Sequence, residues 1–363
     1  MKAWMFYDFG DMRLEEIPDP VAKPGWVVCK VRRVQPSITD AQRAIGIKTM
    51  GFEEMSEVLK TKRPVQMLGH EMSAEVIEVG DGVTKFKVGD VVLTSGHIPC
   101  GTCDWCKLGR DSWCSKKINI GITIPGAFAE KIALPETGLL LAPKGLDDAS
   151  ITCLQPLSTT VAGIRDSNLK PGQTVAITGQ GVMGLYMLQA ARMNGAGAVY
   201  VTDVRDEVLS LSKKYKADAI INANRVDPVE EILKLTHGKG VDVVFECAGG
   251  HPGQGMSGHT TLHQAFKMVR LGGSVVQLAG LVGEIKLDAQ LLRTKGIKWI
   301  FIEGHGNDTT SIGAQWVSSG RIDVKTLVTN ELFGIEKLPE VFEITRNKEK
   351  YQATNPCQLV LIK

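Results

Sequence analysis

The chain has 363 residues, of which 43% are apolar and 23% are charged, and its formal net charge is +2. This length predicts two domains, and the composition excludes an intrinsically disordered chain, which would combine low hydrophobicity with high charge. Positive and negative charges nearly balance, so the chain lacks the excess of positive charge that is typical of proteins that bind nucleic acid or anionic membranes. Asp8 and Asp11 interrupt the N-terminal stretch, and no run approaches the roughly 18 apolar residues of a membrane span. We therefore expect a cytoplasmic protein without a signal peptide that binds neither nucleic acid nor membranes.

About the first 150 residues have the pattern of a β-rich domain. Short apolar runs at 26–31, 74–79 and 91–94 are bounded by turns that contain glycine. Such runs predict antiparallel strands in a barrel-like sheet rather than strand–helix–strand units.

A cluster of cysteines interrupts this β-rich region. Cys100, Cys103, Cys106 and Cys114 follow the spacing Cys-x2-Cys-x2-Cys-x7-Cys. Four thiolates in one loop complete a tetrahedral shell around zinc and leave no open position for substrate, so we predict one structural zinc per chain. An iron–sulfur cluster is the alternative that this spacing leaves open.

After Pro143 the pattern changes to alternating strands and helices. The expected strands are 175–178, 199–203, 219–222, 241–246 and 274–278, and the expected helices are 182–193, 207–215, 229–235 and 260–269. A turn is expected at Gly272-Gly273, before the last of these strands. This alternation predicts a parallel, doubly wound sheet.

A glycine-rich loop links the first of these strands to its helix. Gly179, Gly181 and Gly184 form a GxGxxG motif, which in this context permits a tight turn, close approach of a pyrophosphate and packing of helix on strand. Asp203 ends the second strand, where a carboxylate binds the ribose hydroxyls and repels a 2′-phosphate, so NAD is favoured. Arg205 keeps NADP open as the alternative. The predicted cofactor-binding residues are Gly179, Gly181, Val182, Met183, Gly184, Asp203, Arg205, Ala279 and Gly280.

Taken together, these motifs resemble the medium-chain dehydrogenase/reductase superfamily, and within it the zinc-containing alcohol, polyol and threonine dehydrogenases. The resemblance includes the Gly69-His70-Glu71 motif, the cysteine cluster and the GxGxxG loop. It implies an α/β plus β fold in which a GroES-like catalytic domain, residues 1–153 completed by 301–363, accompanies a Rossmann dinucleotide-binding domain at 154–300. It also implies an active site in the cleft between the two domains.

The chain departs from the family at the catalytic zinc, which there takes three protein ligands. The resemblance places Ser37 where the family has its first cysteine ligand, His70 at the second ligand, and Gln155 where the third ligand is a cysteine or glutamate. Gln42 stands where the family often has a proton-relay histidine. Hydroxyl and amide groups are poor replacements for thiolate and carboxylate, so we do not expect a catalytic zinc.

Without that metal, side chains must carry the proton. The resemblance implies that Thr39 hydrogen-bonds the substrate hydroxyl, and His70 offers a general acid–base group with an ordinary pKa near 6.5. Glu71 is expected to hold the tautomer of His70, and Asp40 to be a structural carboxylate. The predicted catalytic residues are Ser37, Thr39, His70, Glu71 and Gln155.

We therefore predict an NAD(H)-dependent oxidoreductase that interconverts a small secondary alcohol and a ketone. Two alternatives remain open: a zinc-independent reductase of an activated C=C bond, and an NAD(H)-binding protein that has lost catalysis. Residues 299–303 resemble the strand through which family members pair their nucleotide domains, so we expect a homodimer or homotetramer. The Gly-rich segment 251–259 is expected to form a loop over the cofactor cleft.

Overall fold

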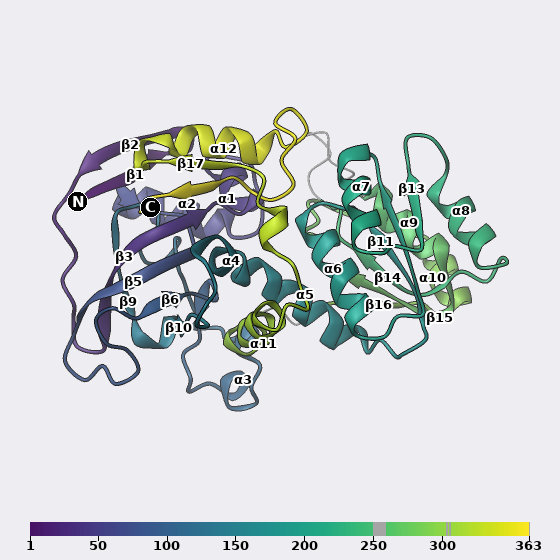
Figure 1. Ribbon diagram of the computed structural model, residues 1–363, viewed down its shortest axis with the longest axis horizontal. Helices are drawn as coiled ribbons and strands as arrows, with labels where there is room; N and C mark the ends of the chain where they lie inside the picture. The colour runs from purple at the N-terminus through teal and green to yellow at the C-terminus, as the bar shows by residue number, and fades with distance from the viewer. Residues whose placement is uncertain (250–258, 303, 305, 363) are drawn as a thin grey trace. The chain divides into compact units, whose positions relative to one another are not determined.

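The computed structural model describes residues 1–249, 259–302, 304 and 306–362. Most of the segment expected to cover the cofactor cleft, 251–258, therefore lies outside the described residues, as does position 303 of the expected pairing strand. The chain divides into two compact units, Met1–Ser158 with Gly304–Lys363, and Thr159–Glu303 (Figure 1). The expected boundary, after residue 153, lies just before helix α5 (Leu154–Ser167), whereas the observed division falls within this helix, after Ser158. Across the described ranges, no helix is long and apolar enough to cross a membrane.

The first unit is built on a seven-stranded sheet. Its main path runs β10-β6-β5-β3-β18-β17, and β9 also pairs with β3. The strands are β3 (Trp26–Gln35), β5 (Glu71–Val79), β6 (Val91–Leu93), β9 (Lys131–Pro135), β10 (Leu140–Leu141), β17 (Glu331–Phe333) and β18 (Gln358–Val360). Nearly all of these pairings are antiparallel, β17–β18 being the parallel one.

Smaller elements complete this unit. A three-stranded sheet contains β1 (Lys2–Asp8), β2 (Asp11–Glu16) and β4 (Val65–Gln66), and a hairpin contains β7 (His97–Ile98) and β8 (Ile118–Asn119). The helices are α1 (Ile38–Arg43), α2 (Phe52–Lys62), α3 (Asp104–Lys107), α4 (Asp148–Thr152), α11 (Asn307–Ser318) and α12 (Leu338–Arg346). One apolar core holds side chains from both ends of the chain, such as Val34, Met72 and Phe342.

The C-terminal strand returns to the N-terminal sheet. Leu359 of β18 pairs with Val34 of β3, and Val360 pairs with Arg33. The last residues of the chain therefore complete the unit that its first residues begin (Figure 1).

The second unit is a six-stranded parallel sheet in the order β13-β12-β11-β14-β15-β16. The strands are β11 (Thr174–Thr178), β12 (Ala198–Asp203), β13 (Ala219–Asn222), β14 (Val241–Glu246), β15 (Val269–Gln277) and β16 (Lys298–Phe301). The connecting helices are α6 (Val182–Met193), α7 (Asp206–Lys214), α8 (Pro228–Leu235), α9 (Thr260–Met268) and α10 (Ala289–Lys295). This order changes direction between β11 and β14, which is where a doubly wound sheet binds its ligand.

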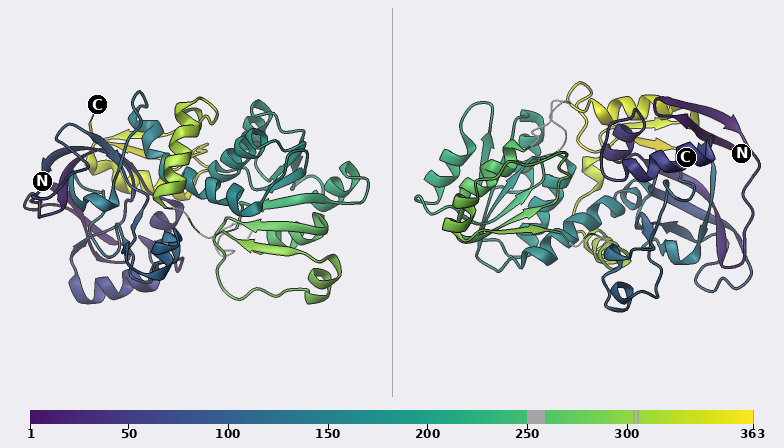
Figure 2. Two further views of the ribbon diagram at one scale, coloured as in Figure 1. Left: turned by 90° about the horizontal axis from the view of Figure 1, so that it is seen from below. Right: turned by 180° about the vertical axis from the view of Figure 1, so that it is seen from behind.

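Both faces of this sheet are covered by helices (Figures 1 and 2). Val175 and Ile177 of β11 point to one face, where they join side chains of α6 and α7. Ala176 points to the other face, into a cluster with side chains of α8 and α9. Because side chains alternate along a strand, a strand buried on both faces has a continuous apolar run, as β11 does.

Strand β15 differs from the sequence expectation. The expected helix extended to Val269 and the turn fell at Gly272-Gly273, yet β15 begins at Val269 and includes both glycines. Its register against β14 shifts between Val241 and Val243, and a Cβ on Gly273 would lie 2.8 Å from the Asp242 carbonyl oxygen. The glycines therefore mark a bulge with a close strand–strand approach.

Candidate functional site

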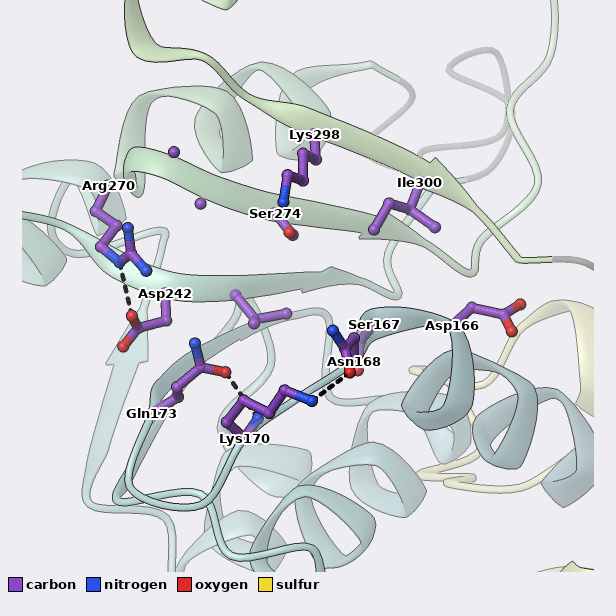
Figure 3. A pocket seen from close by; sticks show the side chains of 13 residues that line it. Asp166, Ser167, Asn168, Lys170, Gln173, Asp242, Arg270, Ser274, Lys298 and Ile300 are labelled. Carbon is purple, nitrogen blue, oxygen red and sulfur yellow. Dashed lines mark hydrogen bonds and ion pairs between the residues drawn. The ribbon is translucent and has the colours of Figure 1, made fainter.

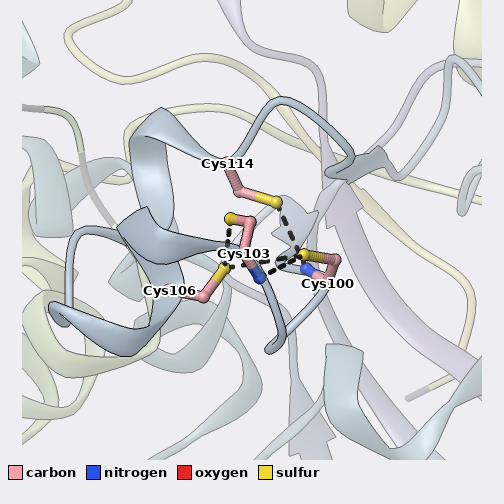
Figure 4. Close-up of side chains that lie close together, drawn as sticks. All are labelled: Cys100, Cys103, Cys106 and Cys114. Atoms are coloured by element: carbon pink, nitrogen blue, oxygen red, sulfur yellow. Dashed lines mark hydrogen bonds between the residues drawn. The ribbon is translucent and has the colours of Figure 1, made fainter.

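Four cysteine side chains converge in the loop between β7 and β8 (Figure 4). Their Sγ atoms all lie within 4.8 Å of one another, with 3.4 Å between Cys103 and Cys106 and 3.9 Å between Cys100 and Cys106. A tetrahedron with zinc–sulfur bonds of about 2.3 Å has edges of about 3.8 Å. The sulfurs therefore have the spacing that a tetrahedral zinc requires.

The local backbone and the thiols themselves favour a bound cation. The Cys100 sulfur accepts hydrogen bonds from the Thr102 hydroxyl and the Cys103 N–H, and these contacts lower the pKa of Cys100 to about 5. Burial and the neighbouring Cys103 raise the pKa of Cys106 to about 12. Without a metal, Cys106 therefore stays a neutral thiol at pH 7, whereas a bound metal would deprotonate all four thiols.

A second cluster surrounds His70, which precedes β5. The His70 Nδ1 lies 3.4 Å from the Asp40 carboxylate, and Asp40 also accepts a 2.7 Å bond from the Arg43 guanidinium. The Asp40 side chain is fully buried and that of His70 is 18% exposed. The Gly69 N–H points at the same carboxylate at 3.4 Å. Asp40 therefore fixes the ring of His70 while Arg43 neutralises the buried charge.

Ser37 and Thr39 belong to the start of α1. The Ser37 hydroxyl accepts the Asp40 N–H at 3.0 Å, and the Asp40 carboxylate accepts the Ser37 N–H at 3.3 Å, which is a capping box. The hydroxyls of Ser37 and Thr39 are 2.8 Å apart. Ser37 thus has a helix-capping role, for which serine is a preferred residue and cysteine is not.

Glu71 does not hold the tautomer of His70, contrary to expectation. Its carboxyl group accepts a 2.6 Å bond from Gln35, and burial raises the pKa of Glu71 to about 8. Asp40 takes the position beside the imidazole. The reason is that Glu71 is the first residue of β5, where successive side chains point to opposite faces.

Gln155 lies beside His70 at a glycine that no motif predicted. Its amide donates to the Ser95 carbonyl at 3.3 Å. A Cβ on Gly96 would lie 3.0 Å from the Gln155 Nε2 and 3.1 Å from the His70 Cδ2, and Gly96 has a φ of +91°. Because Gly96 has no side chain, its backbone fits between the side chains of Gln155 and His70. The fold brings Ser37 and Thr39 together at α1 and His70 and Gln155 together at Gly96.

The donors near His70 do not match those of a zinc site. Among the described residues, the cysteine cluster alone has three or more His, Cys, Asp or Glu side chains placed to share an ion. The nearby thiol of Cys153 is buried against Gln358 and Asn355, at 3.4 and 3.8 Å. The serine hydroxyl and glutamine amide at the family's ligand positions are weak zinc donors.

The glycine-rich loop has the geometry of a phosphate-binding turn. Gly179 has a φ of +80°, which favours glycine. A Cβ on Gly184 would lie 1.8 Å from the Gly179 carbonyl oxygen, whereas one on Gly181 would meet nothing within 4 Å. Gly184 therefore permits helix α6 to pack on the turn, and Gly181, at the N-cap of α6, leaves space for a phosphate.

Asp203 stands at the end of β12 beside this loop. Its carboxylate accepts bonds from the N–H groups of Gln180, Val204 and Arg205 at 2.6, 2.7 and 2.9 Å. The Arg205 guanidinium lies 3.9 Å from Asp203 and 3.3 Å from Glu207. A negative group is therefore fixed where a ribose would bind, and the nearby arginine already faces two carboxylates.

A hollow of about 230 Å³ lies at the other end of this sheet (Figure 3). Asp242 of β14, Ser274 of β15 and Lys298 of β16 contribute to its lining, and Ser274 pairs with Lys298, the first residue of β16. Ligands of doubly wound sheets bind at the carboxyl ends of the strands, so this hollow is separate from the predicted cofactor site.

Comparisons with known proteins agree with this architecture. Residues 23–144 match the alcohol dehydrogenase GroES-like domain, and residues 182–318 match the zinc-binding dehydrogenase family. The chain is 31% identical over 336 residues to L-threonine 3-dehydrogenase of Pyrococcus furiosus, covering 92% of this chain and 91% of that protein. The chain belongs to the medium-chain dehydrogenase/reductase superfamily. It is also 30% identical to sorbitol dehydrogenase of Bacillus subtilis, covering 100% of this chain and 97% of that one.

Solved structures of this superfamily share the fold. An alcohol dehydrogenase from Thermus sp. ATN1 superposes with a TM-score of 0.83 at 25% identity, covering 99% of this chain and 100% of that one. A zinc-binding dehydrogenase from Sinorhizobium meliloti, bound to NADP, gives 0.83 at 25% identity and covers 99% of each chain. The predicted family and the predicted GroES-like plus Rossmann fold class are confirmed. The chain is a nicotinamide-dependent oxidoreductase of the alcohol dehydrogenase type.

Proposed function

We propose that this chain oxidises a small secondary alcohol to a ketone with NAD, and catalyses the reverse reaction, without a catalytic zinc. The observation that carries the proposal is the pair of Asp40 and His70, 3.4 Å apart in a buried site. The bound nicotinamide would accept the hydride from the alcohol carbon. The chain must then bind the hydroxyl, take its proton and stabilise the reacting oxygen.

We assign to His70 the role of accepting the proton of the alcohol hydroxyl. Burial lowers the pKa of His70; Asp40 opposes this effect and Arg43 reinforces it. The ring is therefore neutral at pH 7, with Nδ1–H donated to Asp40 and Nε2 left to accept the alcohol proton. The hydroxyl pair of Ser37 and Thr39 supplies hydrogen bonds for the substrate oxygen.

We assign the preference for NAD to Asp203. Its carboxylate is held by three backbone N–H groups, so it stays fixed as a hydrogen-bond acceptor for the ribose hydroxyls. A 2′-phosphate at the same place would be repelled by this charge. Arg205 faces Asp203 and Glu207, which reduces its availability to a phosphate.

We assign one structural zinc to Cys100, Cys103, Cys106 and Cys114. The spacing of their sulfurs supports this assignment. Such a site contributes to folding and leaves the chemistry to other residues.

The relatives suggest the class of substrate. They are named for threonine and sorbitol, which are small molecules with a secondary hydroxyl beside other polar groups. We propose a substrate of this kind, in a cytoplasmic homodimer or homotetramer. The edge strand β16, whose Phe301 is 59% exposed, supports such an assembly.

A substrate panel tests the proposal. Purified protein is assayed with polyols, hydroxy amino acids, the corresponding ketones and enones, each with NAD(H) and NADP(H). Turnover of secondary alcohols and ketones with NAD(H) is expected. Turnover of enones alone would favour the C=C reductase, and NAD(H) binding without any turnover would favour the non-catalytic alternative.

A further inference from the structure

A buried carboxylate stands at the carboxyl end of β14, in the middle of the parallel sheet. Glu246 is the last residue of this strand and is 0% exposed. No motif in the sequence drew attention to it. A buried carboxylate is costly unless hydrogen bonds surround it, so its partners show what it does.

One oxygen of Glu246 holds the loop that follows its own strand. Oε1 accepts the N–H groups of Ala248 and Gly249, each at 3.0 Å. It also accepts the hydroxyl of Thr261, on α9, at 2.7 Å, and the hydroxyl of Thr178, the last residue of β11, at 3.4 Å. This oxygen therefore ties the β14 loop to the strand that leads into the glycine-rich turn.

The other oxygen holds the loop after the neighbouring strand. Oε2 accepts a 2.5 Å bond from the amide of Gln277, the last residue of β15. The same amide nitrogen donates to the Ala279 carbonyl at 2.8 Å, and the Ala279 N–H donates to the Glu246 carbonyl at 3.1 Å. Glu246 is thus linked in two ways to Ala279, one of the predicted cofactor-binding residues. Its carboxylate is linked through the Gln277 amide, and its backbone carbonyl accepts the Ala279 N–H.

The loops held in this way approach each other closely. A Cβ on Gly179 would lie 2.8 Å from the Ala248 Cα, and one on Gly249 would lie 2.5 Å from the Ala279 Cβ. A displacement of the β14 loop would therefore also displace the glycine-rich turn and the loop after β15.

We infer that Glu246 is a positioning residue for the dinucleotide, because its carboxylate joins the three loops at the carboxyl edge of the sheet into one cradle. The inference rests on the proposed NAD(H) function and extends it to a residue outside the GxGxxG motif. Glu246 itself need not touch the cofactor. Its effect is to keep the backbone groups around the pyrophosphate and nicotinamide in their binding positions.

The same strand offers a matched control. Asp242, near the start of β14, also bridges to both neighbouring strands. It accepts the Thr174 N–H on β11 at 2.8 Å. It also accepts a 2.6 Å bond from the Arg270 guanidinium on β15, which Figure 3 shows. It lies at the end of the sheet away from the three loops. A purely structural role would make Asp242→Asn and Glu246→Gln equivalent.

The test measures NADH affinity by fluorescence and the melting temperature of each variant in the intact chain. Glu246→Gln sets an amide NH₂ against the Gln277 amide, so the Kd for NADH should rise about tenfold, the size expected when a buried donor loses its acceptor. Asp242→Asn should lower the melting temperature with an unchanged Kd. If Glu246→Gln does not fold, Gln277→Met, which removes the amide that links Glu246 to Ala279, should raise the Kd in the same way.

A double variant that exchanges the two side chains, Glu246 and Gln277, completes the test. Gln277→Glu alone sets two carboxylates against each other and should also weaken binding, whereas the double variant Glu246→Gln with Gln277→Glu restores a donor opposite an acceptor and should bind NADH more tightly than either single variant. An unchanged Kd in folded Glu246→Gln, or an equal rise in Asp242→Asn, would overturn the inference alone. Failure of the unmutated protein to bind NADH would overturn the proposed function and the inference with it.

Discussion

At the scale of single residues, the proposed mechanism depends on the contacts that Arg43 and Asp40 make around the imidazole of His70. Arg43 and Asp40 form a pair that is 5% and 0% exposed, so neither charge is left without compensation. The carboxylate faces the Nδ1 of His70, which directs the basic Nε2 away from it. We therefore propose that His70 accepts the proton without help from a metal.

Replacement of the imidazole tests its role directly. His70→Ala should lower kcat for alcohol oxidation by about 10²–10⁴, the usual contribution of general acid–base catalysis, with an unchanged Kd for NADH. His263→Ala is the matched control, because that ring is on helix α9 of the other unit and is hydrogen-bonded to the Lys286 carbonyl. An equal loss in both variants would contradict the assignment.

The pH dependence of kcat/KM tests whether His70 acts as the base in its neutral form. The base works when neutral, so kcat/KM for alcohol oxidation should fall as pH decreases through the pKa of His70, which burial keeps below its ordinary value of 6.5. Asp40 raises this pKa, so Asp40→Asn should move the falling limb to still lower pH. If the decrease in kcat/KM moved to higher pH in Asp40→Asn, this result would argue against His70 as the base.

The family resemblance predicted site residues such as His70 and Ser37, but the sequence did not predict their contacts. The orientation of Glu71 depends on where β5 begins, and the role of Gly96 depends on side chains that are far apart in the sequence. Arg43 belongs to no motif, because its function is to neutralise a neighbour.

At the scale of elements, we propose that a zinc ion stabilises the cysteine loop. Cys103→Ala should abolish zinc retention and lower the melting temperature by at least about 5 °C, because a structural zinc contributes directly to folding. Metal analysis and thermal unfolding measure the two effects. Cys247→Ala, which removes a thiol outside the cluster, should retain the zinc; loss of zinc there too would contradict the assignment of the four ligands.

We propose that Asp203, at the end of β12, determines the choice between NAD and NADP. Asp203→Ala should reduce the preference for NAD over NADP, measured as a ratio of kcat/KM values, by about tenfold, since it removes hydrogen bonds to a charged acceptor. Asp206→Ala is the control, because this exposed carboxylate contacts Asn222 and Arg225. A wild-type preference for NADP would assign specificity to Arg205 instead.

Local patterns predicted most elements of the second unit. Strand β14 and helix α6 have the predicted bounds, because a buried parallel strand and an amphipathic helix each have a clear periodicity. Strand β15 was missed at its start because Gly272 and Gly273 have the pattern of a turn, whereas the structure uses them in a bulge. The pairing that permits this bulge is not visible in the local sequence.

At the scale of the whole molecule, the first unit needs both ends of the chain. Strand β18 joins β3 across most of the sequence, and Phe342 of α12 packs on Phe128 with ring centroids 5.3 Å apart. Only the resemblance to a family implied this return, since no periodicity reports a pairing between such distant segments. The proposed catalytic residues of α1 and at the start of β5 therefore belong to a unit whose main sheet includes the C-terminal strand β18.

The central claim is that one zinc, held by the cysteine loop, suffices for turnover. Zinc content per chain and kcat are measured together after dialysis against a chelator that leaves the cysteine site loaded. Ser37→Cys with Gln155→Glu serves as a positive control, because Cys, His and Glu would offer three strong donors and retain a second zinc. One zinc per chain and full activity are expected in the unmutated protein; two zincs per chain, or activity lost on chelation and restored by Zn²⁺, would show that turnover depends on a second metal.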